Sequence, residues 1–443
     1  MKIRIAYDAM VLVSQYRQSD SKSGIVRETE EIMHELGRMD DLDLTLVCIC
    51  GESSSAFGSL HFQSYIRNGL RNEEKDYKYA DVFSSKLGVR SIYEKFYNFD
   101  ILSQNFYRLN PSTSIKSISG RVVFKFAREA IKLFGLFDYR PVLECKDFDI
   151  YHSTYNKLPS KEITKTIPRV LTVQDLIPVI APELVSPNLT KDFQNTLNSI
   201  DLKNDWVICI SEYTRKQFCE YTGMSIDRTF VTPLAAASHF YPVSDLDRIA
   251  IDRQHYGIPK GNYFLSLASY LAPHKNLDRL IRCFFKLISD RPDLDINLVL
   301  AGSKRYKPGE SMSHPDFPDL NSRVIYTGYI ADEDLSSIYS GATAFIFPSL
   351  FEGFGLPTLE AMQCGTPVIT SNTTSLPEVV GDAGITIDPL DEDALCQAML
   401  NLLTDSNLVR ELKQKGFERS KKFSWAKCTV DTVEVYKKIL SSY

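Results

Sequence analysis

The chain has 443 residues, of which 44% are hydrophobic and 24% are charged, and its formal net charge is −5. This composition is typical of a soluble globular protein with about two or three domains, and the acidic balance argues against nucleic acid as the main partner. The nine cysteines are an odd number without a paired C-x-x-C spacing, which favours reduced thiols over a disulfide framework or a structural zinc site.

The N-terminal residues form an apolar run that could be mistaken for a signal peptide. Arg4 and Asp8 interrupt this run, and no small-residue cleavage site follows it. We therefore interpret it as a first strand. The sequence contains no run of 18 apolar residues, so no membrane span is predicted and we expect a cytoplasmic protein.

Short apolar runs recur along the chain, with helical patterns between many of them. Buried runs that alternate with helices predict parallel sheets covered on both faces, and two such series predict an α/β protein with two doubly wound domains. The predicted strands are Ile3–Asp8, Leu44–Ile49, Asp149–His152, Arg169–Val173, Trp206–Ile210, Phe230–Pro233, Tyr263–Ala268, Asn297–Ala301, Val324–Thr327, Ala344–Phe347, Pro367–Thr370 and Gly384–Asp388.

We expect an N-terminal domain over residues 1–240, a linker over 241–258, a C-terminal domain over 259–425 and a final helix over 426–443. Ligands of doubly wound folds bind beyond the carboxyl ends of the strands, so the site is expected in the cleft between the two domains.

Residues 60–140 depart from this pattern and form an atypical insert. Within it, residues 108–137 combine an apolar stripe with a basic face, which predicts an amphipathic helix. Two interpretations stay open: the helix packs on a core with its basic side in solvent, or it contacts the inner face of a membrane or the acceptor.

The stretch 348–384 carries the most specific chemical pattern of the chain. Glu352 precedes a glycine loop that ends at Gly355, and Glu360 falls in the first turn of a helix that Pro357 is suited to begin. A strand, a glycine turn and a helix together present backbone N–H groups and a helix dipole to an anion. A carboxylate can accept two hydrogen bonds from a vicinal diol. The pattern therefore predicts a pocket for a nucleotide sugar.

Two further positions fit the same ligand. Gly24 follows the first strand after a polar loop, where it would let the backbone approach a phosphate; a plain helix N-terminus is the alternative. Lys275 lies between a predicted strand and a predicted helix, where its compact charge suits a diphosphate.

With these parts in place, the chain resembles the retaining nucleotide-sugar glycosyltransferases of family 4, also called group 1, which have the GT-B fold of two facing Rossmann-like domains. The E-x7-E motif of the family is matched by Glu352 and Glu360 within FEGFGLPTLEAM. The match implies that Glu352 contacts hydroxyls of the donor sugar and that Glu360 contacts the ribose. It also implies that Lys275 and His274 lie at the phosphates, and that the pocket is lined by Gly302, Ser303, Tyr329, Ile330, Gly355, Leu356 and Pro357. At the acceptor side it points to Gln174 and Asp175 within TVQDLIP, and it implies that the final helix, 426–443, crosses back to the N-terminal domain.

The sequence departs from the family pattern at two positions. Many members carry arginine where this chain has Tyr270, so diphosphate neutralisation would rest on Lys275, on backbone donors and on a partly protonated His274. Members often carry histidine where this chain has Gln174, which can position a substrate but cannot accept a proton as a base.

The resemblance implies transfer of a sugar from a UDP- or GDP-sugar to a hydroxyl of a polysaccharide or a lipid-linked glycan, with retention and without a metal or another cofactor. A nucleotide-sugar 2-epimerase of the same architecture and a non-catalytic partner subunit stay open as alternatives. A glycosidase would also use two acids, but the helix N-terminus beside the pair favours an anionic ligand.

Overall fold

The computed structural model describes residues 2–12, 24–49, 77–79, 143, 146–268, 272–302 and 318–443. The predicted basic helix at 108–137 and all of the predicted insert except 77–79 lie outside these residues. The chain forms two compact units. The first comprises Met1–Thr172, Asn198–Trp206 and Lys438–Tyr443, and the second comprises Val173–Leu197 and Val207–Lys437.

The first sheet has seven strands in the order β3-β2-β1-β4-β5-β6-β7. The pairs β3–β2, β2–β1, β1–β4, β4–β5 and β6–β7 are parallel, as the alternation of buried runs and helices predicts. The strands are β1 (Ile3–Asp8), β2 (Leu42–Val47), β3 (Lys78–Tyr79), β4 (Ile150–Ser153), β5 (Arg169–Val173), β6 (Trp206–Cys209) and β7 (Thr229–Val231).

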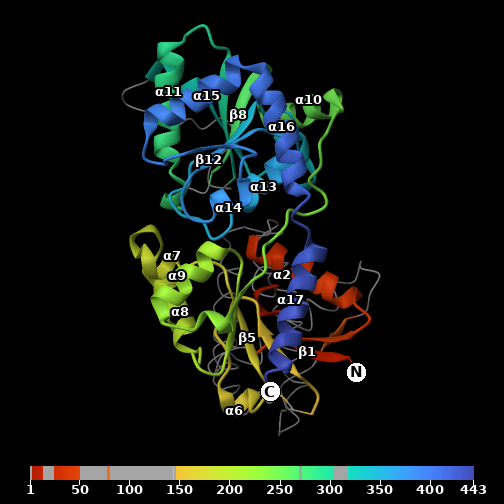
Figure 1. Cartoon of the computed structure of the whole chain (residues 1–443). Coiled ribbons are helices and arrows are strands. Elements are labelled where there is room, and N and C mark those ends of the chain that lie inside the picture. The colour runs from red at the N-terminus through yellow and green to blue at the C-terminus, as the bar shows by residue number, and fades with distance from the viewer. Residues whose placement is uncertain are drawn as a thin grey trace, which may run out of the picture. The chain divides into compact units, whose positions relative to one another are not determined.

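Helices follow most of these strands along the chain (Figure 1). They are α2 (Gly24–Arg38), α6 (Lys161–Thr164), α7 (Ile177–Ile180), α8 (Pro187–Asn198) and α9 (Glu212–Thr222), with 3-10 turns η2 (Pro182–Leu184) and η3 (Ile226–Arg228). The sequence explains the ends of α9, because the Ser211 hydroxyl accepts from the N–H of Thr214 and Gly223 ends the helix at φ 72°.

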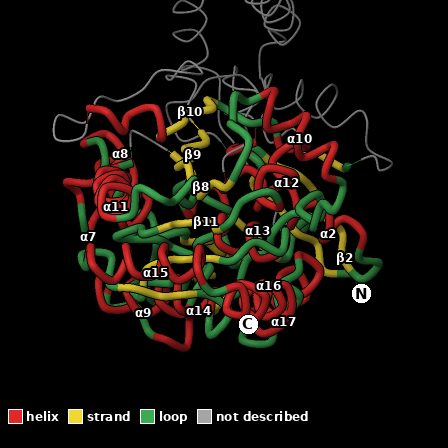
Figure 2. The backbone as a smooth tube through the Cα atoms, turned by 90° about the horizontal axis from the view of Figure 1, so that it is seen from above, coloured by secondary structure: helices red, strands yellow, loops and turns green. Residues whose placement is uncertain are grey.

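The second sheet has six strands in the order β10-β9-β8-β11-β12-β13, and its pairs are also parallel. Figure 2 shows β8, β9 and β10 running beside one another. The chain passes from β8 outward to β10, then returns to β11 on the other side of β8, which is the doubly wound arrangement. The strands are β8 (Asn262–Ala268), β9 (Ile296–Gly302), β10 (Val324–Gly328), β11 (Ala344–Phe347), β12 (Val368–Ser371) and β13 (Ile385–Ile387).

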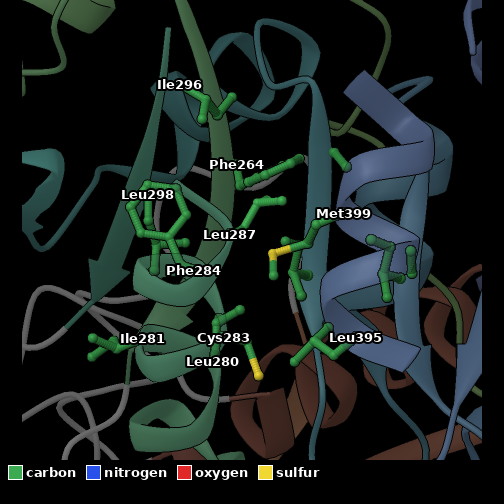
Figure 3. Close-up of a cluster of buried hydrophobic side chains, with 14 of the residues drawn as sticks. Phe264, Leu280, Ile281, Cys283, Phe284, Leu287, Ile296, Leu298, Leu395 and Met399 are labelled. Carbon is green, nitrogen blue, oxygen red and sulfur yellow. The ribbon is translucent and has the colours of Figure 1, made fainter. Parts of the chain in front are cut away.

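The core of this second sheet lies between its strands and a helix pair on one face. Figure 3 shows Phe264 of β8 beside Leu287 of α11 and Met399 of α15, all of them buried. Ala344 and Ile346 of β11 belong to this core, and Phe345 between them points to the opposite face of the sheet. There the ring of Tyr339, on α12, makes an edge contact with the ring of Phe345. The helices and 3-10 turns of this part of the chain are α10 (Leu246–His255), η4 (Pro273–Lys275), α11 (Leu277–Asp290), η5 (Pro318–Arg323), α12 (Asp332–Ser340), α13 (Leu356–Gln363), α14 (Leu376–Val380), α15 (Glu392–Thr404), α16 (Ser406–Ser420) and α17 (Trp425–Leu440).

The predicted fold class is confirmed: the protein is α/β with two Rossmann-like parallel sheets. Each predicted strand coincides with an observed one, with ends that differ by at most two residues. The two-residue strand β3 had no apolar run to signal it, and its residues are exposed. The segment predicted as a linker, 241–258, contains helix α10. The predicted domain limits, the cleft and the crossing of the last helix stay predictions.

Candidate active site

The glycine loop joins β11 to α13, as the sequence predicts. Gly355 is the residue before the helix and has φ 105°, a conformation that favours glycine. A Cβ there would also lie 2.6 Å from the side chain of Leu376. Leu356 is the first helical residue and Pro357 the second, so the prediction that Pro357 begins the helix is wrong by one position. The physical reason for a proline holds at both positions, because neither N–H has an intrahelical partner.

Lys275 and Glu352 form an ion pair, with 2.6 Å between Nζ and Oε1. The lysine ends the turn η4 after β8, and the glutamate lies in the loop after β11, the strand that pairs with β8. The two loops are joined by the N–H of Leu350, which donates to the carbonyl of His274. The lysine Nζ also lies 4.7 Å from the ring centroid of Phe347. The structure therefore brings both predicted residues together at the carboxyl edge of the sheet.

The surroundings of His274 disfavour the partial positive charge that the sequence suggested. Burial lowers the pKa of its imidazole below the ordinary value and the neighbouring Lys275 lowers it further, while Glu352 opposes the shift. This shift argues against a partly protonated His274 at neutral pH. Its buried Nδ1 has no hydrogen-bond partner in the part of the chain that the structure describes. A neutral ring can still donate to or accept from a ligand.

Asp175 and Gln174 follow β5 and belong to the same compact unit as the glycine loop. The pKa of Asp175 is raised to about 6, chiefly by burial and also by Glu352, while a hydrogen bond from the N–H of Ile177 and the charge of Lys275 oppose the shift. The loop also touches this segment directly, because a Cβ on Gly353 would lie 2.0 Å from the carbonyl oxygen of Gln174. Asp175, Glu352 and Lys275 thus form one electrostatic cluster.

Glu360 is the fifth residue of α13, so the prediction that it falls in the first turn is wrong by one position; it is 4% exposed. Its Oε2 accepts a hydrogen bond from the Tyr339 hydroxyl at 3.2 Å. No sequence pattern pointed to this partner, since Tyr339 occupies an ordinary apolar position of α12. The contact holds the carboxylate in one orientation on its helix.

The other predicted residues lie at strand ends or outside the described residues. Gly302 ends β9 with φ 146°, and Tyr329 and Ile330 follow β10 directly. Ser303 and Tyr270 are outside the residues that the structure describes. Gly24 is exposed at the first residue of α2, in the other unit, and its contact with a phosphate stays a prediction.

Sequence reasoning missed the residues that hold the glycine loop in place. The Ser375 hydroxyl donates to the carbonyls of Glu352 and Phe354, at 2.9 and 3.0 Å. The N–H of Glu352 donates to the Thr374 hydroxyl at 3.2 Å, and Thr374 has φ 57°. A Ser or Thr before Leu-Pro signals only the start of a helix, so the pattern could not reveal these loop contacts.

A cation, two buried carboxylates and a helix start now lie at the carboxyl edge of a parallel sheet. This set can hold an anion and a polyhydroxylated group side by side. Within the described ranges, no group of three or more His, Cys, Asp or Glu side chains is placed to bind a metal ion. In the same ranges no helix is both long and apolar enough to cross a membrane.

Known proteins are similar to this chain in sequence and in fold. Residues 261–405 match the family model "Glycosyl transferases group 1". The chain is 31% identical over 334 residues to O-antigen chain mannosyltransferase B of Escherichia coli, covering 74% of this chain and 86% of that one. It is 33% identical over 278 residues to the serotype-specific mannosyltransferase WbdA of Escherichia coli, covering 62% of this chain but only 34% of that one.

A solved glycosyltransferase from Rickettsia africae ESF-5 superimposes with a TM-score of 0.62 at 16% identity and covers 100% of both chains. This likeness supports the fold, and the sequence identity to the mannosyltransferase supports the family and its enzymatic function. The chain belongs to the group 1 glycosyltransferases.

Proposed function

We propose that this glycosyltransferase moves mannose from a nucleoside diphosphate mannose to a hydroxyl of a glycan or a lipid-linked glycan, with retention at the anomeric carbon. Mannose is chosen because two relatives that match a large part of this chain are named mannosyltransferases. The observation that carries the proposed site is the Lys275–Glu352 pair, set beside buried Asp175 at a sheet edge.

In this proposal, Lys275 turns toward the donor diphosphate and stabilises the charge that develops on the leaving group. Glu352, freed to accept from sugar hydroxyls, and ionised Asp175 stabilise the positive charge that develops on the sugar ring. Glu360, held by Tyr339, accepts from the ribose diol. The acceptor hydroxyl attacks from the face that the diphosphate leaves, and a phosphate oxygen of the donor takes its proton.

Gln174 has no place in this scheme as a base, because an amide cannot take the proton; it positions the substrate. We propose further that lysine, backbone donors and the α13 dipole neutralise the diphosphate without a metal. Peripheral contact with the inner face of a membrane, through 108–137, is part of the proposal for a lipid-linked acceptor.

The proposal is tested with the full chain, GDP-mannose, UDP-mannose and UDP-glucose, and a mannose-terminated acceptor. We expect acceptor-dependent release of nucleoside diphosphate with one of the mannose donors, unchanged by EDTA, and an α-linked product from an α-linked donor by NMR. A β-linked product would contradict retention. Conversion of the donor sugar without any acceptor would identify an epimerase instead.

A further inference from the structure

The start of helix α9 is capped by a carboxylate from a distant helix. Oε1 of Glu378, on α14, accepts from the N–H of Tyr213 at 2.7 Å, and Oε2 accepts from the N–H of Glu212 at 2.9 Å. The Ser211 hydroxyl accepts from the N–H of Thr214 at 3.0 Å. The N–H groups of the first three helical residues are thereby satisfied, two of them by one side chain.

The same helix start holds the glycine loop of the site. The hydroxyls of Ser211 and Thr214 lie 2.8 and 3.2 Å from the carbonyl oxygen of Gly353, and both can donate to it. Gly353 comes directly after Glu352 and lies so close to the carbonyl of Gln174 that a Cβ would not fit between them. A shift of α9 would therefore move the loop that carries Glu352.

Helix α14 reaches the loop from a second direction. Ser375, which precedes α14, donates to the carbonyls on either side of Gly353, while Glu378 lies one turn further along. The loop, α9 and α14 form a closed ring of hydrogen bonds, and all three belong to one compact unit. Glu378 is half-buried, so water competes only partly for its oxygens.

We infer that Glu378 is a positioning residue for the transfer reaction: by capping α9 it fixes the Gly353 loop, and with it Glu352, against the Gln174–Asp175 segment. It acts through the loop and is not itself a catalytic residue. The inference rests on the proposed function, since it assumes that Glu352 contacts the transferred sugar. Nothing in the sequence alone pointed to Glu378, because its two partners lie more than 160 positions away.

The test is Glu378→Gln, which keeps the size of the side chain but turns one capping acceptor into a donor that opposes a backbone N–H. We expect kcat to fall roughly ten- to a hundredfold, the scale of a small misplacement of reacting groups, with the donor KM within about twofold. Ser211→Ala should lower kcat in the same way. The double variant should lose less than the product of the two losses, because both act on one loop.

The matched control is Asp245→Asn. Asp245 also accepts from two N–H groups at a helix start, and these belong to Asp247 and Arg248 of α10 rather than to a helix that holds the loop. It should lower thermal stability without changing kcat. The inference is overturned if Glu378→Gln loses only thermal stability, or if the control loses as much kcat.

Two outcomes separate the positioning role of Glu378 from the proposed site. If Glu352→Gln keeps wild-type transfer, the proposed site is wrong. If Glu352→Gln is inactive while Glu378→Gln and Ser211→Ala keep wild-type kcat, the site stands and only the positioning role is lost.

Discussion

At the residue scale, the site is built from charges that compensate one another. The Lys275–Glu352 pair joins a cation suited to a diphosphate and an anion suited to sugar hydroxyls, with 2.6 Å between them. Both side chains are mostly buried, with 19% and 11% of their surface exposed. Their electrostatic attraction is therefore stronger than that of an ion pair on an open surface. The ion pair keeps both side chains ordered before substrate arrives. A bound donor would replace it, because the diphosphate would then pair with Lys275 and the sugar hydroxyls would donate to Glu352.

Substitution of the two glutamates of the motif should change different kinetic constants. Glu360→Gln should mainly raise the donor KM, because an amide accepts less strongly from the ribose diol. Glu352→Gln should mainly lower kcat, because sugar contacts tighten as charge develops at the anomeric carbon. Steady-state kinetics with the preferred donor measure both constants. Wild-type kinetics in both variants would disprove this assignment.

Asp175 should give the transfer rate an acid limb. Its pKa is raised to about 6 by burial and by Glu352, while Lys275 opposes the shift. Below that pH the carboxyl is neutral and cannot stabilise positive charge on the sugar, so the rate should rise with pH through about 6. Asp175→Asn should be slow and lack this limb in a pH–rate profile.

The raised pKa of Asp175 affects folding stability in the opposite direction from the transfer rate. The folded protein binds the Asp175 proton more tightly than the unfolded chain does, so this group's contribution to stability falls as pH rises from about 4 to about 6. Buried Asp8, whose pKa is also raised to about 6 by burial, adds to the same trend. Asp8→Asn is therefore the control: an acid limb that disappears in this variant and survives in Asp175→Asn would contradict the role of Asp175.

At the element scale, the site depends on how closely the glycine loop approaches the segment after β5. A Cβ on Gly353 would meet the Gln174 carbonyl oxygen at 2.0 Å and the Asp175 Cβ at 2.9 Å. No side chain fits there unless the loop moves. Glycine at this position reflects close packing, whereas at Gly355 it also reflects a left-handed backbone.

Gly353→Ala should lower transfer by about a hundredfold while the fold is kept, because the loop must move away from Gln174. Gly223→Ala is the control, since Gly223 has φ 72° but nothing within 4 Å of its added Cβ. That change should cost about 1 kcal/mol of stability and leave transfer intact. Thermal unfolding and initial rates separate the two effects; equal rates in the two variants would show that the close contact is unimportant.

The sequence predicted the strands well because buried parallel strands are continuous apolar runs, such as Ala344–Phe347. It placed Lys275 and Glu352 in loops after strands and Glu360 on the following helix, because spacing along one chain fixes such positions; their roles stay predictions. It could not predict the Tyr339–Glu360 contact or the Glu378 cap, since hydrogen bonds between distant segments leave no local pattern. The charge of His274 was also out of reach, because burial decides it.

At the scale of the whole molecule, the membrane contact predicted for the segment 108–137 calls for a test of its own, because the segment lies outside the described residues. Residues 108–132 carry six basic side chains against one acidic one, and each basic residue near an anionic leaflet contributes about 1 kcal/mol. If the acceptor is lipid-linked, the full chain should pellet with anionic liposomes and be released as salt rises.

The matched variant changes Arg121, Lys125, Arg128 and Lys132 to Glu. It should stay in the supernatant and keep slow donor hydrolysis, because the proposed donor site lies elsewhere in the sequence. If the wild-type protein does not bind anionic liposomes at low salt, the proposed membrane contact is wrong and a soluble acceptor is favoured.

The central claim for the molecule is that Lys275 stabilises the leaving diphosphate of a mannose donor, and the most direct test compares mannose transfer by wild type and Lys275→Ala. Lys286→Ala is the control, because Lys286 is an exposed lysine of α11 that pairs with Asp393. We predict that Lys275→Ala lowers transfer at least a hundredfold, roughly 3 kcal/mol of lost stabilisation, while binding of the free nucleoside and the activity of the control persist. Wild-type transfer by Lys275→Ala would contradict the account.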